Sequence, residues 1–320
     1  MKKIETAILK QKLNAFLQKF FEADVAQACA DVILYAELRA KGDQGLPKLL
    51  GDAALQNVKA KQEIEIQEKS KLSVHIQGHG NPSFYVAQMA TQQAIARAQQ
   101  HGFGIVGANG IFSSTGVLGY YAELMANQGL IGFCCARSPG SVVPFDLTVP
   151  LFGTNPLAWG IPTTKEPIVF DMATAAITWY KLVVAKMRGE KIPAGVAIDK
   201  FGELTQDPAA AMGGGILPFD KGYKGSGLGM MVELLSGPLV GAAYCDYETF
   251  DKDWGFLVMA IDPAILVDAQ TFKEQCTDMV NIIHSHGAKI PGENGRAYEE
   301  KIRTQGYLEV DDEIAELLQL

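Results

Sequence analysis

The sequence of 320 residues has no long hydrophobic run. No stretch approaches the roughly 20 apolar residues that a helix needs to cross a bilayer, so we expect no membrane-spanning segment. The N-terminus also lacks the uninterrupted apolar core of a secretory signal peptide, because polar residues interrupt it early, at Lys10, Gln11, Lys12 and Asn14. We therefore expect a cytoplasmic protein.

Basic residues are scarce relative to acidic ones. Lysine and arginine number 28 against 36 aspartates and glutamates, which gives a net charge of −8. The strongest basic clusters, residues 1–3 and 59–71, are typical of solvated surface and form no basic block. The composition therefore argues against a nucleic-acid partner. With 48% hydrophobic and 20% charged residues, the chain is an ordinary globular protein of two domains, or of one large domain with an added helical part.

Cysteine is also sparse, and its spacing does not suit a metal site. The five cysteines are an odd number, and most of them lie in apolar surroundings: Cys29, Cys134, Cys135, Cys245 and Cys276. We interpret them as reduced core residues and expect no zinc site.

The ends of the chain are helical in pattern and its middle is rich in strands. Apolar spacing from Ile4 to Arg39 predicts two helices with Asp24 capping the second, and three helical runs close the chain at 269–286, 295–305 and 311–320. Between them the pattern predicts strands within 63–77 and at 105–106, 130–136, 157–161, 168–170 and 254–261, with helices at 83–100, 119–127, 173–188 and from 226. We predict an α/β protein with a helical terminal domain (1–75 with 264–320) and a sheet-containing domain (76–263).

Glycines surround a lysine in the stretch from Leu217 to Ala242. Lys224 stands among Gly222, Gly225, Gly227 and Gly229, and a helix-forming run follows. Backbone N–H groups at a helix start can hold an anion, so this stretch predicts a phosphate site. The alternative is a glycine-rich turn that only leads into a core helix.

The stretch from Phe152 to Thr174 adds a second pattern. Together the two stretches resemble the type-2 malate/L-lactate dehydrogenase family, whose patterns G-T-N-P, P-I-V-x-D-M-A-T and K-G-x-G-L followed by V-E-x-L-S-G are matched here. Weaker matches extend the resemblance over most of the chain, at 116–121, 129–132, 199–207 and 291–293. The resemblance implies reduction of 2-oxo acids or cyclic imino acids with NADH or NADPH. It also implies a homodimer and a non-Rossmann dinucleotide-binding sheet domain with packed N- and C-terminal helical segments.

A literal G-x-G-x-x-G motif occurs from Gly102 to Gly107. In a Rossmann fold this motif follows a strand, opens a helix and is followed by an acidic residue about 20 positions later. Here a predicted helix precedes the motif, and His101-Gly102 looks like the C-terminal end of that helix. We interpret the motif as a helix cap followed by a strand, with no role in cofactor binding.

The resemblance assigns the dinucleotide contacts to three separated places, all but the last within the predicted sheet domain. They are Ile168, Val169, Phe170, Asp171, Met172 and Ala173; Tyr223, Lys224 and Gly225; and Gly292, Glu293 and Asn294. Lys224 offers a compact positive charge for phosphate, and Glu293 could accept hydrogen bonds from ribose hydroxyls. Asp171 is equally well explained as a helix cap. The sequence leaves the choice between NADH and NADPH open.

The resemblance also implies a histidine that protonates the substrate, but alignment puts Gln44 at that position, in the run Asp43 to Lys48. A second family histidine aligns with Ser114. Gln44 can donate a hydrogen bond but exchanges no proton near neutral pH. We therefore count Gln44, Lys48, Ser114 and Tyr120 as catalytic candidates.

Three explanations of the glutamine remain open. Another group, Lys48, Tyr120 or Asp43, supplies the proton; the substrate is a cyclic ketimine that already carries it; or the protein only binds a dinucleotide. Lys48 or Arg137 would hold the substrate carboxylate. Each of these two could equally be an ordinary surface cation, and Tyr120 could be a core aromatic residue.

Overall fold

Seven strands form one sheet at the centre of the molecule. The structure, a computed structural model, describes residues 1–50, 54–60, 62–245 and 254–320. Across the sheet the order is β2 (Glu65–Ser70), β3 (Ser73–Gln77), β4 (Phe103–Ile111), β10 (Trp254–Ile261), β5 (Ile131–Arg137), β6 (Leu157–Ile161) and β7 (Ile168–Met172). Of these pairings only β3 with β4 is parallel. A Rossmann sheet is mostly parallel, so the predicted non-Rossmann α/β class is confirmed.

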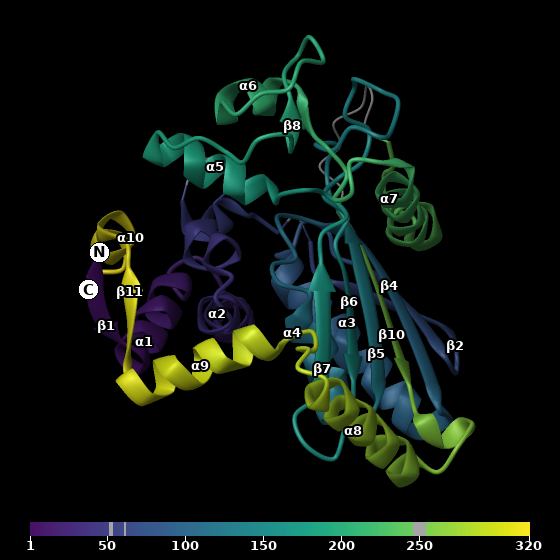
Figure 1. Cartoon of the computed structure of the whole chain (residues 1–320). Coiled ribbons are helices and arrows are strands. Elements are labelled where there is room, and N and C mark those ends of the chain that lie inside the picture. The colour runs from purple at the N-terminus through teal and green to yellow at the C-terminus, as the bar shows by residue number, and fades with distance from the viewer. Residues whose placement is uncertain (51–53, 61, 246–253) are drawn as a thin grey trace.

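Helices cover both faces of this sheet (Figure 1). On one face lie α3 (Ser83–His101) and α4 (Gly119–Asn127), and a Cβ added at Gly104 would lie 2.2 Å from the carbonyl oxygen of Ala94 in α3. On the other face lie α7 (Tyr223–Ser236) and the short helix η4 (Pro238–Val240). A Cβ added at Gly107 would lie 2.8 Å from Cγ1 of Val240 in η4. Successive strand residues point to opposite faces, so these two glycines mark the two helical layers.

The two ends of the chain meet in a second unit beside the sheet. Strand β1 (Lys2–Glu5) pairs antiparallel with β11 (Tyr307–Val310), next to α1 (Thr6–Leu17), α2 (Ala23–Leu38), α9 (Glu293–Gln305) and α10 (Asp312–Leu317). Figure 1 shows both termini at this place, with α9 running from β7 toward β11 and α8 (Ala269–Ser285) beside the sheet. The ends therefore pack together as predicted, although β1 and β11 were not predicted.

A small third unit has its own apolar core. It contains α5 (Trp179–Arg188), α6 (Pro208–Gly213), β8 (Ala197–Ile198) and β9 (Gly215–Ile216), around residues such as Leu182 and Ile216. Figure 1 places it above the edge of the sheet at which β5 and β7 end. The predicted domain division did not include it. The predicted boundary at residue 75 also falls inside β3, so β2 lies in the sheet, and the division stays a prediction.

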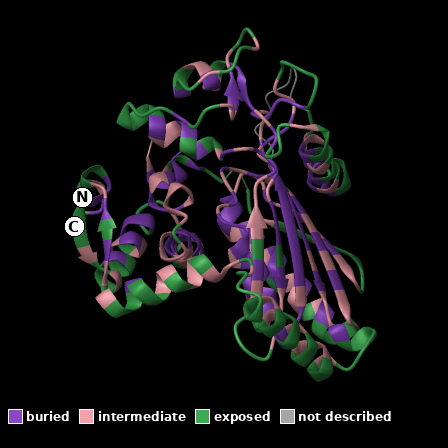
Figure 2. Ribbon diagram, in the orientation of Figure 1, coloured by how far each residue is buried: buried purple, intermediate pink, exposed green. Residues whose placement is uncertain are grey.

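Most predicted elements are found, with shifted ends. Helix α5 begins at Trp179, where the Thr178 side chain accepts a hydrogen bond from the Lys181 N–H, and not at residue 173. The N-cap of α2 is Glu22, and Asp24 lies in its first turn, so the cap prediction was wrong by two residues. Figure 2 shows buried residues along the central strands and in α2, and exposed ones on α8 and α9.

The G-x-G-x-x-G motif has the predicted structure. Gly102 ends α3 in the left-handed conformation, with φ 81°, and β4 starts at the next residue. Three of the cysteines, Cys29, Cys134 and Cys135, are buried as expected, whereas Cys245 is exposed and Cys276 is intermediate.

The remaining helices are single turns of 3-10 type. They are η1 (Gly42–Gln44), η2 (Leu46–Leu49), η3 (Leu55–Asn57) and η5 (Pro263–Ile265). The first two carry the candidate residues Gln44 and Lys48. They follow α2 and place these side chains beside the sheet.

Candidate active site

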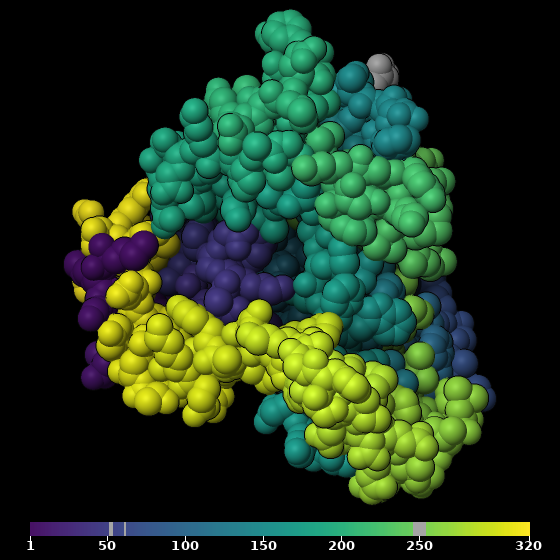
Figure 3. Space-filling view, in the orientation of Figure 1, coloured from purple at the N-terminus to yellow at the C-terminus, as the bar shows by residue number. Residues whose placement is uncertain are grey.

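A cavity of about 520 Å³ lies where β5 and β7 end and β6 and β10 begin. Figure 3 shows the surface hollowed between the N-terminal segment near residues 40–50 and the middle of the chain. Its wall combines charged, hydroxyl and aromatic side chains, including Lys41, Asp43, Gln44, Lys48, Ser114, Arg137, Thr154, Asp171, Thr178, Trp179, Tyr180 and Trp254. The catalytic candidates Gln44, Lys48 and Ser114 are thus brought together with Arg137, a candidate for binding the substrate carboxylate.

Lys48 is buried in this wall, with 3% exposure. Its Nζ donates to Ser114 Oγ at 3.0 Å and lies 3.3 Å from the centre of the Tyr180 ring. Burial lowers the pKa of this ammonium well below its ordinary value of 10.5, and the charge of Asp43 offsets part of the shift. Lys48 is therefore not an ordinary surface cation, and its proton is unusually easy to remove.

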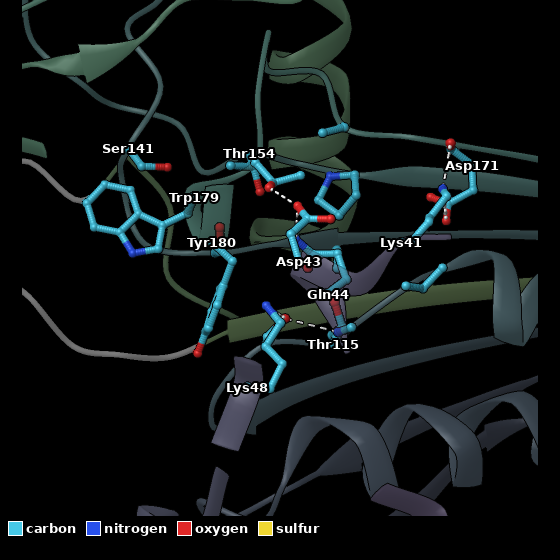
Figure 4. A pocket seen from close by; sticks show the side chains of 18 of the residues that line it. Lys41, Asp43, Gln44, Lys48, Thr115, Ser141, Thr154, Asp171, Trp179 and Tyr180 are labelled. Atoms are coloured by element: carbon cyan, nitrogen blue, oxygen red, sulfur yellow. Dashed lines mark hydrogen bonds and ion pairs between the residues drawn. The ribbon is translucent and has the colours of Figure 1, made fainter. Parts of the chain in front are cut away.

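Asp43 and Gln44 lie on η1 in the centre of the wall (Figure 4). The Asp43 carboxylate accepts hydrogen bonds from Thr178 Oγ1 at 2.5 Å and from Gln44 Nε2 at 3.2 Å. The first contact joins the N-terminal unit to the start of α5, across 135 residues of sequence. Gln44 is partly exposed in the cavity and offers its amide there.

Arg137 ends β5 and is fully buried, with 0% exposure. Its Nε lies 3.3 Å from Glu233 Oε1 of α7, and one of its terminal N–H groups donates to the Ser138 carbonyl oxygen at 3.0 Å. Arg137 therefore adds a fixed positive charge to the cavity wall.

The end of β7 forms another part of the wall. Asp171 accepts a hydrogen bond from Lys41 Nζ at 3.0 Å and from the Gly119 N–H, the first residue of α4, at 3.1 Å. Asp171 therefore lies in a strand and faces the start of a helix that precedes it by 52 residues, so the interpretation as a cap of the following helix was wrong. Met172 and Ala173 also line the cavity.

The glycine-rich turn at the start of α7 already holds an oxyanion. Asp220 Oδ1 accepts hydrogen bonds from the N–H groups of Gly222, at 2.9 Å, and Gly225, at 3.0 Å. An internal carboxylate thus occupies these two donors, and the phosphate site expected at this turn stays a prediction. The side chains of Tyr223 and Lys224 are exposed beside it.

The third predicted cofactor segment packs against the first. Gly292 has φ 87°, and a Cβ there would lie 2.9 Å from the Val169 carbonyl oxygen of β7, so only glycine fits this approach. Glu293 accepts from the Ile290 N–H at 3.0 Å and lies 2.5 Å from His284 Nε2, and Asn294 accepts from Lys289 at 2.9 Å. Two of the three predicted cofactor segments are thus neighbours in space.

Tyr120 does not line the cavity. Its hydroxyl accepts a hydrogen bond from Gln88 at 3.0 Å, its ring packs edge-on against Tyr35 and Tyr121, and burial raises its pKa to about 12. The structure thus matches the alternative reading of Tyr120 as a core aromatic residue.

The sequence reasoning missed the aromatic side of the cavity. Trp179 and Tyr180, at the start of α5 (Figure 4), line it, and so does Trp254, at the start of β10. The prediction of a helix from residue 173 placed Trp179 and Tyr180 in the middle of that helix, away from its end. Thr178 is a good N-cap residue, and recognising it would have placed both aromatic residues at the start of the helix.

Among the described residues, no helix is long and apolar enough to cross a membrane, and no three His, Cys, Asp or Glu side chains are grouped so as to hold a metal ion.

Comparison with known proteins gives consistent matches along the whole chain. A model of the malate/L-lactate dehydrogenase family matches residues 4–319. L-sulfolactate dehydrogenase of Methanothermobacter thermautotrophicus is 34% identical, over 98% of this chain and 93% of its own. The Δ1-pyrroline-2-carboxylate/Δ1-piperideine-2-carboxylate reductase of Pseudomonas aeruginosa is 30% identical, over 89% of this chain and 88% of its own. The crystal structure of Δ1-piperideine-2-carboxylate reductase from Pseudomonas syringae superposes with a TM-score of 0.88 at 28% identity, covering 100% of this chain and 99% of the other.

Proposed function

This chain belongs to the malate/L-lactate dehydrogenase family and is an oxidoreductase of small organic acids, and we propose that it reduces a 2-oxo acid to a 2-hydroxy acid with NADH or NADPH in the cavity beside Lys48. The observation that carries this proposal is the buried Lys48, whose ammonium lies 3.0 Å from Ser114 Oγ in a wall that also contains Arg137. Such a wall offers a proton and a cation to one small anionic substrate.

The residues present fit a dinucleotide. The aromatic wall of Trp179, Tyr180 and Trp254 suits a flat ring, and the exposed Lys224 offers a positive charge for phosphate. We assign cofactor binding to the segments Ile168–Ala173, Tyr223–Gly225 and Gly292–Asn294. Bound NADH or NADPH would supply a hydride. Because Asp220 takes the two glycine N–H groups, Lys224 would meet phosphate through its exposed side chain.

The protein's own part in the reaction is to hold the substrate and deliver a proton. Arg137 faces the substrate carboxylate. The Lys48 ammonium donates its proton to the oxygen on C2 as that oxygen gains negative charge, and takes it back in the reverse direction. Its lowered pKa brings this exchange closer to neutral pH, and the Ser114 hydroxyl fixes the position of Nζ.

The function is tested by steady-state kinetics of Lys48→Met and Lys48→Arg with pyruvate, oxaloacetate and sulfopyruvate. Both variants should lose about 10²- to 10⁴-fold in kcat, since methionine has no proton to give and arginine does not release one. Tyr120→Phe is the comparison that separates the two candidate acids. A loss of rate in Tyr120→Phe with full activity in Lys48→Met would contradict the assignment.

A second candidate substrate is a cyclic ketimine, favoured by the two carboxylates in the wall, Asp43 and Asp171, beside three aromatic rings. A protonated ketimine carries positive charge next to its carboxylate, and aromatic faces attract cations. It also needs no proton from Lys48. If this is the substrate, Δ1-pyrroline-2-carboxylate will be reduced far faster than pyruvate, and Gln44→His will raise activity toward 2-oxo acids only.

We also propose that the protein is a cytoplasmic homodimer. Exposed apolar side chains on α7, among them Met230, Met231 and Leu234, offer a surface for a second copy. Sedimentation of the purified protein tests the oligomeric state.

A further inference from the structure

A buried ion pair lies behind the cavity, and its acidic member takes no part in the chemistry proposed above. Arg137 and Glu233 are 0% and 2% exposed, and Arg137 Nε lies 3.3 Å from Glu233 Oε1. Removing two charges from water is costly, and mutual attraction offsets the cost only when further hydrogen bonds satisfy both groups. The surroundings of Glu233 therefore decide what the pair can do.

Both oxygens of Glu233 are held by hydrogen bonds from elsewhere in the chain. Asn155 Nδ2 donates to Oε2 at 2.7 Å, and the Cys245 N–H donates to Oε1 at 3.1 Å. The same Asn155 amide donates to the Gly229 carbonyl oxygen, one turn earlier in α7, at 3.0 Å. Glu233 is thus fixed relative to its own helix and to the loop that precedes β6.

Asn155 is itself held in a restricted backbone conformation. It is 0% exposed, and its φ of 41° is one that asparagine adopts more readily than most residues other than glycine. The preceding Gly153 is also tightly packed, since a Cβ there would lie 2.4 Å from the Ser138 carbonyl oxygen, which accepts the hydrogen bond from Arg137. The loop at Gly153 therefore packs directly against the carbonyl group of Ser138 to which Arg137 is bonded.

This arrangement gives two sequence motifs a common purpose. Asn155 belongs to the run Gly-Thr-Asn-Pro, and Glu233 to the run Val-Glu-Leu-Leu-Ser-Gly, 78 residues later. Neither residue is part of the cavity wall, whereas Arg137, which Glu233 contacts, is.

We propose that Glu233, braced by Asn155, is a positioning residue that fixes the guanidinium of Arg137 for the carboxylate of the substrate. The proposal rests on the proposed function, in which Arg137 meets that carboxylate. Arginine binds a carboxylate through N–H groups in a rigid plane, and a contact at Nε sets the orientation of that plane. Glu233 and Asn155 then act on affinity for acids without touching the substrate.

The test compares a 2-oxo acid with its neutral amide, pyruvate with pyruvamide, in wild type, Arg137→Met, Glu233→Gln and the double variant. Wild type should prefer the acid, and Glu233→Gln should raise KM for pyruvate about ten- to a hundredfold with kcat little changed. KM for pyruvamide and the affinity for NADH should stay as they are. In the double variant KM should equal that of Arg137→Met, since two residues that act through one contact are not additive.

Ser236→Ala is the matched control, because Ser236 is also buried on α7 but bonds to the Val232 carbonyl oxygen. It should leave the preference for acid over amide unchanged. Asn155→Ser provides a second variant if Glu233→Gln does not fold, and it should reduce the same preference.

The outcomes separate this proposal from the proposed function. If wild type reduces neither 2-oxo nor 2-imino acids, the function itself fails. If Arg137→Met loses the preference for the acid while Glu233→Gln and Asn155→Ser both keep it, only the positioning role is overturned. An equal rise of KM for acid and amide in Glu233→Gln would also overturn it, because a merely structural defect acts on both.

Discussion

Glu37 places a carboxyl group beneath the loop that carries Gln44 and Lys48. Its carboxylate accepts a hydrogen bond from the Leu46 N–H at 2.7 Å, and a Cβ at Gly45 would lie 2.2 Å from it. Burial raises the pKa of Glu37 to about 7 from 4.5, the Leu46 hydrogen bond lowers it in part, and Asp311 and Asp43 raise it further. Near neutral pH this carboxyl group therefore changes its charge beside the loop that carries Gln44 and Lys48.

The pH dependence of stability follows from that shift. The folded pKa lies above the unfolded one, so the contribution to stability is complete below about pH 4.5 and is lost as pH rises through about 7. Relative to Glu37→Gln, wild type should lose up to about 3 kcal/mol of unfolding free energy between pH 5 and pH 8. Urea unfolding at both pH values measures this. Glu300→Gln, at an exposed site, serves as the control, and parallel pH curves for wild type and Glu37→Gln would refute the expectation.

Individual site residues differ in how far sequence could locate them. Lys48 and Ser114 came from motif positions and Arg137 from its charge, and all three line one cavity. The contact between Asp43 and Thr178 left no trace in the sequence, because it joins residues 135 positions apart through the fold alone. The burial that lowers the Lys48 pKa is likewise a property of packing, which no local pattern records.

At the scale of elements, close contact between α3 and β4 explains the glycine motif. A Cβ at Gly104 would lie 2.2 Å from the Ala94 carbonyl oxygen, and main chain cannot move aside as a flexible side chain can. Gly104→Ala should therefore destabilise the protein by about 1–3 kcal/mol. Binding of NADH to the folded fraction should not change. Gly213→Ala is the control, since nothing lies within 4 Å of a Cβ there, and thermal melting compares the two. Weaker NADH binding with an unchanged melting temperature would show instead that the motif contacts the cofactor.

Elements with a strong internal pattern were predicted well. The apolar run of β10 and the amphipathic α4 were found with the same ends in the structure. Strands β1 and β11 have four residues each, and each depends on the other at the far end of the chain. Helix α5 was started too early because residues 173–177 suit a helix, whereas Ala175 forms a bridge to Pro218.

At the scale of the whole molecule, Arg39 joins three helices from distant parts of the chain. Its guanidinium lies 2.7 Å from Glu123 of α4 and 3.2 Å from Glu299 of α9, and it extends from the end of α2. Tyr35 donates a further hydrogen bond to Glu123 at 2.5 Å. This cluster connects the terminal helices to the sheet.

Removing Arg39 should therefore lower the stability of both the terminal helical unit and the sheet unit against unfolding. Arg39→Met leaves Glu123 and Glu299 without this cation in a largely buried place, which should cost about 3–5 kcal/mol in urea unfolding. Arg303→Met is the control. Arg303 also pairs with Glu299, but the Arg303 side chain is 71% exposed, so its removal should cost less than about 1 kcal/mol. Equal losses in the two variants would show that burial of the cluster contributes nothing.

The pairing of β1 with β11 also bears on how the protein folds. Residues 2–5 pair with residues 307–310, about 300 positions away in the sequence. Closing a loop of almost the whole chain is slow, because contacts distant in sequence form late. Until residues 307–310 reach β1, the unit that contains α1 and α2 keeps this edge of the strand unpaired. A chaperone that shields unfolded segments would act on the unit during that time.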